Sequence, residues 1–302
     1  MMSDTPGRMG DSMNFSNGTA LLALCEQNKI NISEAMIQRE TKAIGGNRDE
    51  VVRRMAHSFD IMKDAVKKSL TENISTVGGL IGGEALRVNT YNKQTKPVCG
   101  SLMAKAVAYA LGVPEVNASM GLIVAAPTAG SSGVIPGSFL AVQEDFGLTD
   151  AQMIDALFNA GAIGYLFMRN ATVAGAEGGC QAEVGVASAM AASGITQLMG
   201  GTPEQCLQAA SIATGNILGL VCDPIAGLVE TPCQPRNALG ASNALICAQM
   251  ALSGVTNPIP FDEMVTALYR VGRSLPIELR ETAQGGCAAT PTGCQLCKGI
   301  FG

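Results

Sequence analysis

Three cysteines stand at points where the chain changes between regular and irregular structure. Cys180 follows a Gly-Gly pair in AGAEGGCQAEVG, and Cys222 and Cys233 bracket the stretch CDPIAGLVETPC. Prolines and a glycine argue against a regular helix across residues 222–237. Helix amino termini and irregular loops present backbone N–H groups that stabilise thiolates, as an iron–sulfur cluster requires. Spacing alone leaves a metal site and a chance arrangement equally open.

The other cysteines point to different environments. The chain has ten cysteines and no secretory signal, so a disulfide framework is not expected in a reducing compartment. Cys25, Cys206 and Cys247 fall in apolar, helix-like patterns and are expected to be buried core thiols. Zinc fingers use closely spaced ligand pairs, and the only close pair here is Cys294 with Cys297.

Helical periodicity dominates the chain that must position these cysteines. In residues 47–70 apolar side chains recur at steps of three and four, which predicts one apolar stripe on a long helix. Further helices are expected at residues 33–44, 100–111, 149–168, 180–199, 203–220, 240–252 and 261–271. Strands are expected to be minor, because no run alternates cleanly with β-branched enrichment. The sequence predicts a mainly α fold, with one compact helical domain over residues 19–302 after a flexible tail of residues 1–18.

Composition excludes several classes of protein. The chain has 25 acidic and 20 basic residues and no Lys/Arg cluster with interleaved aromatics, so a nucleic-acid partner is not expected. Its apolar stretches are too short for a membrane span, and its amino terminus lacks the apolar core of a signal peptide. We therefore expect a cytoplasmic protein. With 36 glycines and no Trp, the core must be built from small and aliphatic side chains.

Four long stretches together resemble a known family. In order along the chain they read PEVNASMGLIVAAPTAGSSGVIPG, AGAEGGCQAEVG, CDPIAGLVETPCQPRNALGASNALICAQMALSG and GRSLPIELRETAQGGCAATPTG. They resemble the α subunit, or α region, of the iron–sulfur-dependent L-serine dehydratases, and the likeness runs from about Leu21 to the carboxyl terminus. The resemblance implies an all-α domain carrying a 4Fe-4S cluster on three cysteines, which fall at Cys180, Cys222 and Cys233.

The implied chemistry suits such a cluster. Three thiolates on four irons would leave one iron without a protein ligand, able to act as a Lewis acid on the serine hydroxyl. A base would remove the Cα proton, and loss of water would give an aminoacrylate that hydrolyses to pyruvate and ammonia. No pyridoxal phosphate is expected, since the chain has no family-like lysine motif for that cofactor.

The Gly-rich stretch PTAGSSGVIPG suits the carboxylate of an amino acid. Its glycines would let backbone N–H groups converge, and its hydroxyl groups add donors; an ordinary Gly-rich turn is the alternative. The candidate residues are Thr128, Gly130, Ser131, Ser132 and Gly133.

Weaker candidates lie close to these motifs. Asn117, Ser119 and Lys105 precede the Gly-rich stretch, and Lys105 could instead be a helix residue whose ammonium reaches solvent. Polar residues beside the cysteines could orient ligands or substrate, or could only cap helices and form salt bridges. These are Glu177, Asp223, Arg236 and Asn237.

The only histidine, His57, falls off the apolar stripe of the helix at residues 47–70 and is expected at the surface. The family's smaller α/β region, with a Ser-rich segment ending in His-Thr, has no counterpart here. That region is thought to supply the catalytic base. The resemblance therefore implies a separate β subunit, a hetero-oligomer and an active site shared between chains.

The tail offers a further hypothesis, because Cys294 and Cys297 lie near an end that could reach a finished site. One of them, with Cys297 favoured, would occupy the open iron when serine is absent; exposed thiols on a frayed end are the alternative.

Two other functions stay open: a cysteine desulfidase-type lyase, and a structural zinc or electron-transfer protein.

Overall fold

Polar side chains mark where many of the helices begin. Asn17, Asn31 and Asn47 each accept a hydrogen bond from a backbone N–H in the first turn of the helix that follows. Thr149 and Thr202 form capping boxes with the glutamines three residues later. Local sequence therefore fixes these helix starts before any tertiary contact is considered.

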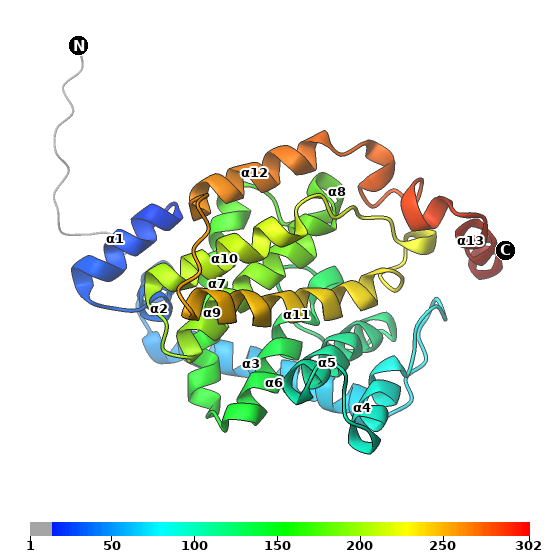
Figure 1. Ribbon diagram of the computed structural model, residues 1–302, viewed down its shortest axis with the longest axis horizontal. Helices are drawn as coiled ribbons and strands as arrows, with labels where there is room; N and C mark the ends of the chain where they lie inside the picture. Colours follow the sequence, from blue (N-terminus) through cyan, green and yellow to red (C-terminus); the bar gives the residue numbers. More distant parts are fainter. Residues whose placement is uncertain (1–13) are drawn as a thin grey trace, which may run out of the picture.

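A computed structural model describes residues 14–302, which fold into packed helices (Figure 1). The α-helices of this part of the chain are α1 (Gly18–Asn28), α2 (Ile32–Ala43), α3 (Arg48–Thr71), α4 (Glu84–Gln94), α5 (Ser101–Ala118), α6 (Val134–Phe146), α7 (Asp150–Asn170), α8 (Gly175–Gly178), α9 (Val186–Leu198), α10 (Pro203–Ile217), α11 (Cys233–Leu252), α12 (Phe261–Ser274) and α13 (Pro291–Phe301). Short turns are η1 (Ala129–Ser131), the π-helical η2 (Gln181–Gly185), η3 (Ile225–Gly227), η4 (Ile277–Leu279) and η5 (Gly286–Ala289). Residues 14–302 contain no strand, only an isolated bridge between Cys222 and Arg280, so the mainly α prediction is confirmed.

The centre of the fold is α9, whose residues from Val186 to Thr196 are all buried. It packs against α7, α10 and α11, and α11 crosses the middle of the view in Figure 1. Close approach needs small residues: a Cβ added at Gly194 would lie 2.5 Å from the ring of Phe139 and 3.1 Å from the carbonyl oxygen of Ala156. The small side chains of α9 thus let its neighbours, α6 among them, pack closely around it.

The structure differs from the sequence predictions at several helix ends. α11 begins at Cys233, so the expectation of an irregular chain through residue 237 is wrong for its last five residues. Pro235 lies in the first turn, where a backbone N–H has no helical acceptor and its loss costs little. α5 runs to Ala118, well past the expected end at residue 111, and continues through Pro114. Helices α4, α6, α8 and α13 were not predicted, and for α1 only a helix-like pattern around Cys25 was noted.

Part of the predicted tail is outside the described residues, which begin at residue 14. Phe15 lies within the described part; it is buried, and its ring meets that of Tyr165 edge-on with centroids 5.7 Å apart. In residues 14–302 no helix combines the length and apolar character that crossing a membrane demands.

Candidate metal centre

Cys180 and Cys222 are brought together by the buried side chain and backbone of Gln181. The Gln181 backbone N–H donates to the carbonyl of Leu220 at 2.9 Å, and its side-chain oxygen accepts from the N–H of Gly219 at 2.9 Å. These bonds hold the turn after α10 against the start of η2. Cys180, immediately before η2, therefore lies beside the segment that carries Cys222.

The other side of Cys222 is fixed by the chain after α12. The Cys222 N–H donates to the carbonyl of Leu279 at 2.9 Å, and the N–H of Glu281 donates to the carbonyl of Cys222 at 2.7 Å. Both backbone groups of Cys222 are thus paired. Its position is fixed by these bonds, and its thiol is not needed for them.

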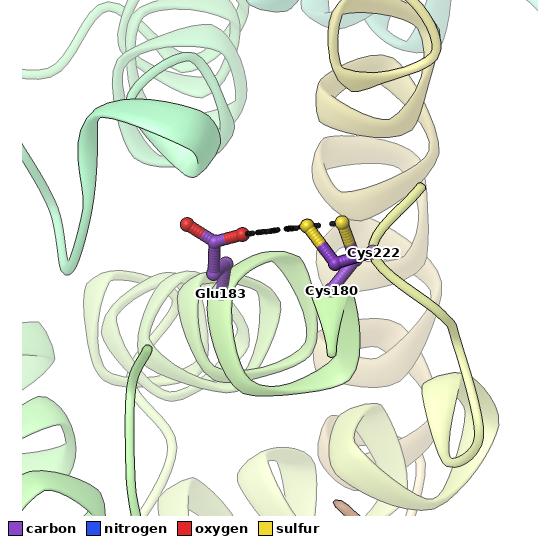
Figure 2. Close-up of side chains that lie close together, drawn as sticks. All are labelled: Cys180, Glu183 and Cys222. Carbon is purple, nitrogen blue, oxygen red and sulfur yellow. Dashed lines mark hydrogen bonds between the residues drawn. The ribbon is translucent and has the colours of Figure 1, made fainter. Parts of the chain in front are cut away.

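Glu183 completes a compact group with the two sulfur atoms (Figure 2). Its Oε2 lies 3.9 Å from Cys180 Sγ and 3.7 Å from Cys222 Sγ, and the three ligand atoms lie within 4.8 Å of one another. The other oxygen, Oε1, accepts from the hydroxyl of Thr128 at 2.6 Å. Two thiols and a carboxylate are donors that transition metals accept, so this group could hold a metal.

Burial and mutual contact disfavour the ionised forms of Cys222 and Glu183 in the metal-free protein. The pKa of the Cys222 thiol is raised by its hydrogen bond with Cys180 and by burial. Burial raises the pKa of the Glu183 carboxyl, and the hydrogen bond from Thr128 opposes that rise. Binding a cation would reverse this preference, because a metal ligand must be a thiolate or carboxylate.

Cys233 lies at the first position of α11 and outside the group of atoms within 4.8 Å. Burial raises the pKa of its thiol, and the negative charges of Cys180 and Glu183 raise it further, so its sulfur lies in the same electrostatic environment. Asn237, one turn along α11, donates to the carbonyl of Cys233 at 2.9 Å and so holds the start of the helix.

A cationic side chain, that of Arg236, lies beside the sulfur of Cys180. The guanidinium of Arg236 lies 3.6 Å from Cys180 Sγ and pairs with the carboxylate of Asp223 at 2.8 Å. Burial acts to raise the pKa of Asp223, but a hydrogen bond from the N–H of Cys287 and the charge of Arg236 outweigh it and hold the pKa below its usual range. The guanidinium thus places a fixed positive charge beside the sulfur of Cys180.

The Gly-rich stretch lies against this centre, with Thr128 on Glu183. Asn237 accepts from the N–H of Gly133 at 2.8 Å and donates to the carbonyl of Gly130 at 2.8 Å, which ties the stretch to the helix that carries Cys233. A Cβ added at Gly130 would lie 2.9 Å from Glu183 Oε1. Ser131 and Ser132 are fully buried, and their hydroxyl groups bond within the stretch itself.

The other sequence candidates make contacts of their own. Lys105 pairs with Glu144 and Asp145 near the carboxyl end of α6, whereas the Gly-rich stretch leads into that helix at its other end. Asn117 and Ser119 end α5, and the hydroxyl of Ser119 bonds to the carbonyl of Val116. Glu177 is exposed and accepts from Thr172. His57 is exposed on α3, as expected.

The tail cysteines lie on α13, which packs on η3 and η5 and stands at the right-hand end of the view in Figure 1. Cys294 is exposed and Cys297 is half-buried. Cys294 Sγ contacts the carbonyl of Ala288 at 3.7 Å. Residues 291–301 form a helix, and the role of these thiols stays a prediction.

Sequence reasoning missed Glu183 and Gly175. Glu183 follows Cys180 by three residues, a spacing that puts two side chains on one face of a helical turn, so a signal was present. Gly175 had no such signal. A Cβ there would lie 2.4 Å from Glu183 Oε2 and 3.1 Å from Cys222 Sγ, so its requirement appears only in three dimensions.

Comparison with known proteins identifies the family of this chain. A profile for the family described as "Serine dehydratase alpha chain" matches residues 27–288. This chain belongs to that family. It is 49% identical over 288 residues to the "Probable L-serine dehydratase, alpha chain" of Bacillus subtilis, a match that covers 95% of this chain and 96% of the relative.

Two more relatives differ in how much of their own length this chain covers. The "L-serine dehydratase, alpha chain" of Peptoniphilus asaccharolyticus is 44% identical over 276 residues, which is 91% of this chain and 94% of the relative. The "L-serine dehydratase" of Mycobacterium tuberculosis is 37% identical over 284 residues, and the match covers 91% of this chain but 61% of that longer relative. The alpha-chain family therefore includes both separate chains and regions of longer ones.

Proposed function

We propose that this chain is the α subunit of an iron–sulfur-dependent L-serine dehydratase, which converts L-serine to pyruvate and ammonia. The observation that carries the proposal is the convergence of Cys180, Cys222 and Glu183 in a buried group, in a chain of the alpha-chain family. Buried, reduced thiols beside a guanidinium, as found here for Cys180, Cys222 and Arg236, provide an environment suited to such a cluster.

The proposed ligands of a 4Fe-4S cluster are Cys180, Cys222 and Cys233. This donor set fits a cluster. The sulfurs of Cys180 and Cys222 already converge, and Cys233, the first residue of α11, lies close enough to feel the charges of Cys180 and Glu183. Bound there, the cluster would supply a Lewis acid for the hydroxyl group that serine loses.

The chain's own residues would bind and orient the substrate. Thr128 presents a hydroxyl group beside Glu183, and the Gly-rich stretch brings backbone to the same place, which suits a carboxylate. Asn237 would hold that stretch at a constant distance from Cys233. Arg236 would place a fixed positive charge beside Cys180, where it would offset negative charge on the bound cluster.

The proton acceptor is proposed to come from another chain. His57, the only histidine of the sequence, is exposed on α3, and the surroundings of the centre described above include no histidine. Two of the relatives are named alpha chains, and the longer relative has further chain that this one does not match. These observations support a β subunit as the partner and an active site shared with it.

The test is iron and acid-labile sulfide analysis of the protein purified without oxygen, followed by turnover of L-serine with and without a β chain from the same source. We expect a brown protein with little activity alone and restored activity with the partner. Cys222→Ser should abolish colour and iron, whereas Cys247→Ser, a buried thiol of α11 bonded to Asn216, should keep both.

Other outcomes would replace the proposal. A colourless protein holding a single zinc ion would make Cys180, Cys222 and Glu183 a structural zinc site. A brown protein that turns over L-cysteine faster than L-serine, in the presence of the partner, would make it a desulfidase. A Cys222→Ser protein with full iron and normal turnover would overturn the ligand assignment.

A further inference from the structure

The chain between Cys222 and Cys233 buries a carboxylate that has no cationic partner among the described residues. Glu230 is 2% exposed. Its Oε1 accepts from the N–H of Gly78 at 2.8 Å, and its Oε2 accepts from the N–H groups of Leu80 at 2.8 Å and Ile81 at 3.2 Å and from the hydroxyl of Thr76 at 3.1 Å. All four donors come from one short loop, residues 76–81.

This loop is shaped to fit the carboxylate. The single hydroxyl proton of Thr76 is shared between Glu230 and the carbonyl of Ile81, which lies 2.7 Å from the Thr76 oxygen, so this bond also closes the loop on itself. A Cβ added at Gly78 would lie 2.4 Å from Leu228 and 2.7 Å from Glu230 Oε1, so only glycine permits this approach. Gly79, at φ +66°, takes the left-handed turn that aligns the donors. The loop is therefore a backbone nest for one anion supplied by the chain itself.

A second attachment lies on the far side of Cys233. Gln234 donates from Nε2 to Glu115 at 2.9 Å and to the carbonyl of Leu111 at 3.2 Å, both on α5. It also lies 3.3 Å from the carboxylate of Glu84, the first residue of α4. The four-residue connection from Glu230 to Cys233 is thus held at one end by the 76–81 loop and at the other by α4 and α5.

We propose that Glu230 is a positioning residue that fixes Cys233 relative to Cys180 and Cys222 through the 76–81 loop. Hydrogen bonds to an ionised acceptor are stronger than neutral ones, and removing the acceptor would leave three part-buried donors and one buried donor unpaired. Losing them would free the turn before α11 and let the Cys233 thiol leave the centre. The inference rests on the proposed function only in giving Cys233 a ligand's role.

The experiment measures cysteine accessibility in the full-length, reduced chain without metal, using N-ethylmaleimide in the absence of oxygen and mass spectrometry of the labelled peptides. In Glu230→Gln we expect Cys233 to label about tenfold faster than in the wild type. Cys206 and Cys247, buried elsewhere in the fold, should label at unchanged rates. Glu204→Gln, an exposed change on α10, is the matched control and should label as the wild type does.

Two further variants keep the inference falsifiable. Glu230→Asp keeps the charge but is one methylene too short to reach all four donors, so it should also expose Cys233; labelling at the wild-type rate in either Glu230 variant would overturn the proposal. If Glu230→Gln exposes Cys206 and Cys247 as well, Thr76→Val decides, since it removes one donor only. Selective labelling of Cys233 in Thr76→Val supports the proposal, and any other result overturns it.

A second readout separates this inference from the proposed function. After anaerobic reconstitution with iron and sulfide, the wild type should load fully and Glu230→Gln incompletely, with an altered electron paramagnetic resonance signal. A wild type that takes up no iron would refute the proposed function, while the labelling rates would still report on Glu230. A Glu230→Gln protein with full iron and an unchanged signal would overturn the positioning role.

Discussion

Glu115 should make the stability of the fold depend on pH near neutrality. Its side chain on α5 is fully buried, and Oε1 accepts from the N–H of Ala85 at 3.0 Å and from Gln234 at 2.9 Å. Burial, aided by the neighbouring carboxylate of Glu84, raises the pKa of Glu115 from 4.5 to about 7. We predict that Glu115→Gln, which stays neutral at every pH, removes a loss of stability that the wild type suffers above pH 6.

The sign and size follow from proton linkage. The folded state binds this proton more tightly than the unfolded state, so the free energy of unfolding falls as the pH rises from 4.5 toward 7 and then levels off. With those two pKa values, the wild type should lose about 1.3 kcal/mol of unfolding free energy between about pH 6 and about pH 8. The pKa of Glu84 is lowered below its usual value, so Glu84 does not titrate in this range.

Urea unfolding of the reduced full-length chain, followed by far-ultraviolet circular dichroism, measures this difference. The gap between Glu115→Gln and wild type should widen in favour of the variant by about 1.3 kcal/mol from about pH 6 to about pH 8. Glu26→Gln, an exposed change on α1, serves as the control with no widening expected. A gap that stays constant to within about 0.5 kcal/mol would refute the reasoning that Glu115 carries the titrating proton.

Two other perturbations test the centre. In Gly175→Ala the new methyl group would lie 2.4 Å from the Glu183 carboxylate, so anaerobic iron uptake should fall sharply; Gly161→Ala, with nothing within 4 Å of its Cβ, should keep full uptake and gain up to about 1 kcal/mol of stability from helix propensity. Ending the chain after Gly293 removes both tail cysteines, and if one of them is a displaceable ligand the resting spectrum should change and iron should be lost faster in air. An unchanged spectrum and air half-life would leave the tail without a role at the metal.

The sequence predicted α3 from its apolar stripe and missed α6, whose pattern is weak. The helix at residues 47–70 was expected almost to the residue because α3 lies on the surface with one apolar stripe. α6 was missed because residues 134–142 are all buried and include a proline and a glycine, so no amphipathic pattern exists to read.

Part of the candidate site could be predicted from the sequence, and part could not. Cys180 and Cys222 stand out in sequence by residue type and by their place at element ends, and the structure brings both to Glu183. The 76–81 loop could not be assigned to Glu230, because about 150 residues separate donors from acceptor and each glycine alone reads as a plain turn. Lys105 illustrates the converse, since nearness in sequence to the Gly-rich stretch did not bring it near in space.

The three thiols of the proposed centre are closed off from solvent, at 2% exposure for Cys180, 1% for Cys222 and 5% for Cys233. A donor of iron and sulfide can reach them only during a transient local unfolding of the segments that cover them. Assembly of the proposed cluster would then be limited by the rate of these local openings. At high donor concentration the loading rate should stop rising and settle at the opening rate, so variants that stiffen this region would mature more slowly even where the finished protein is more stable.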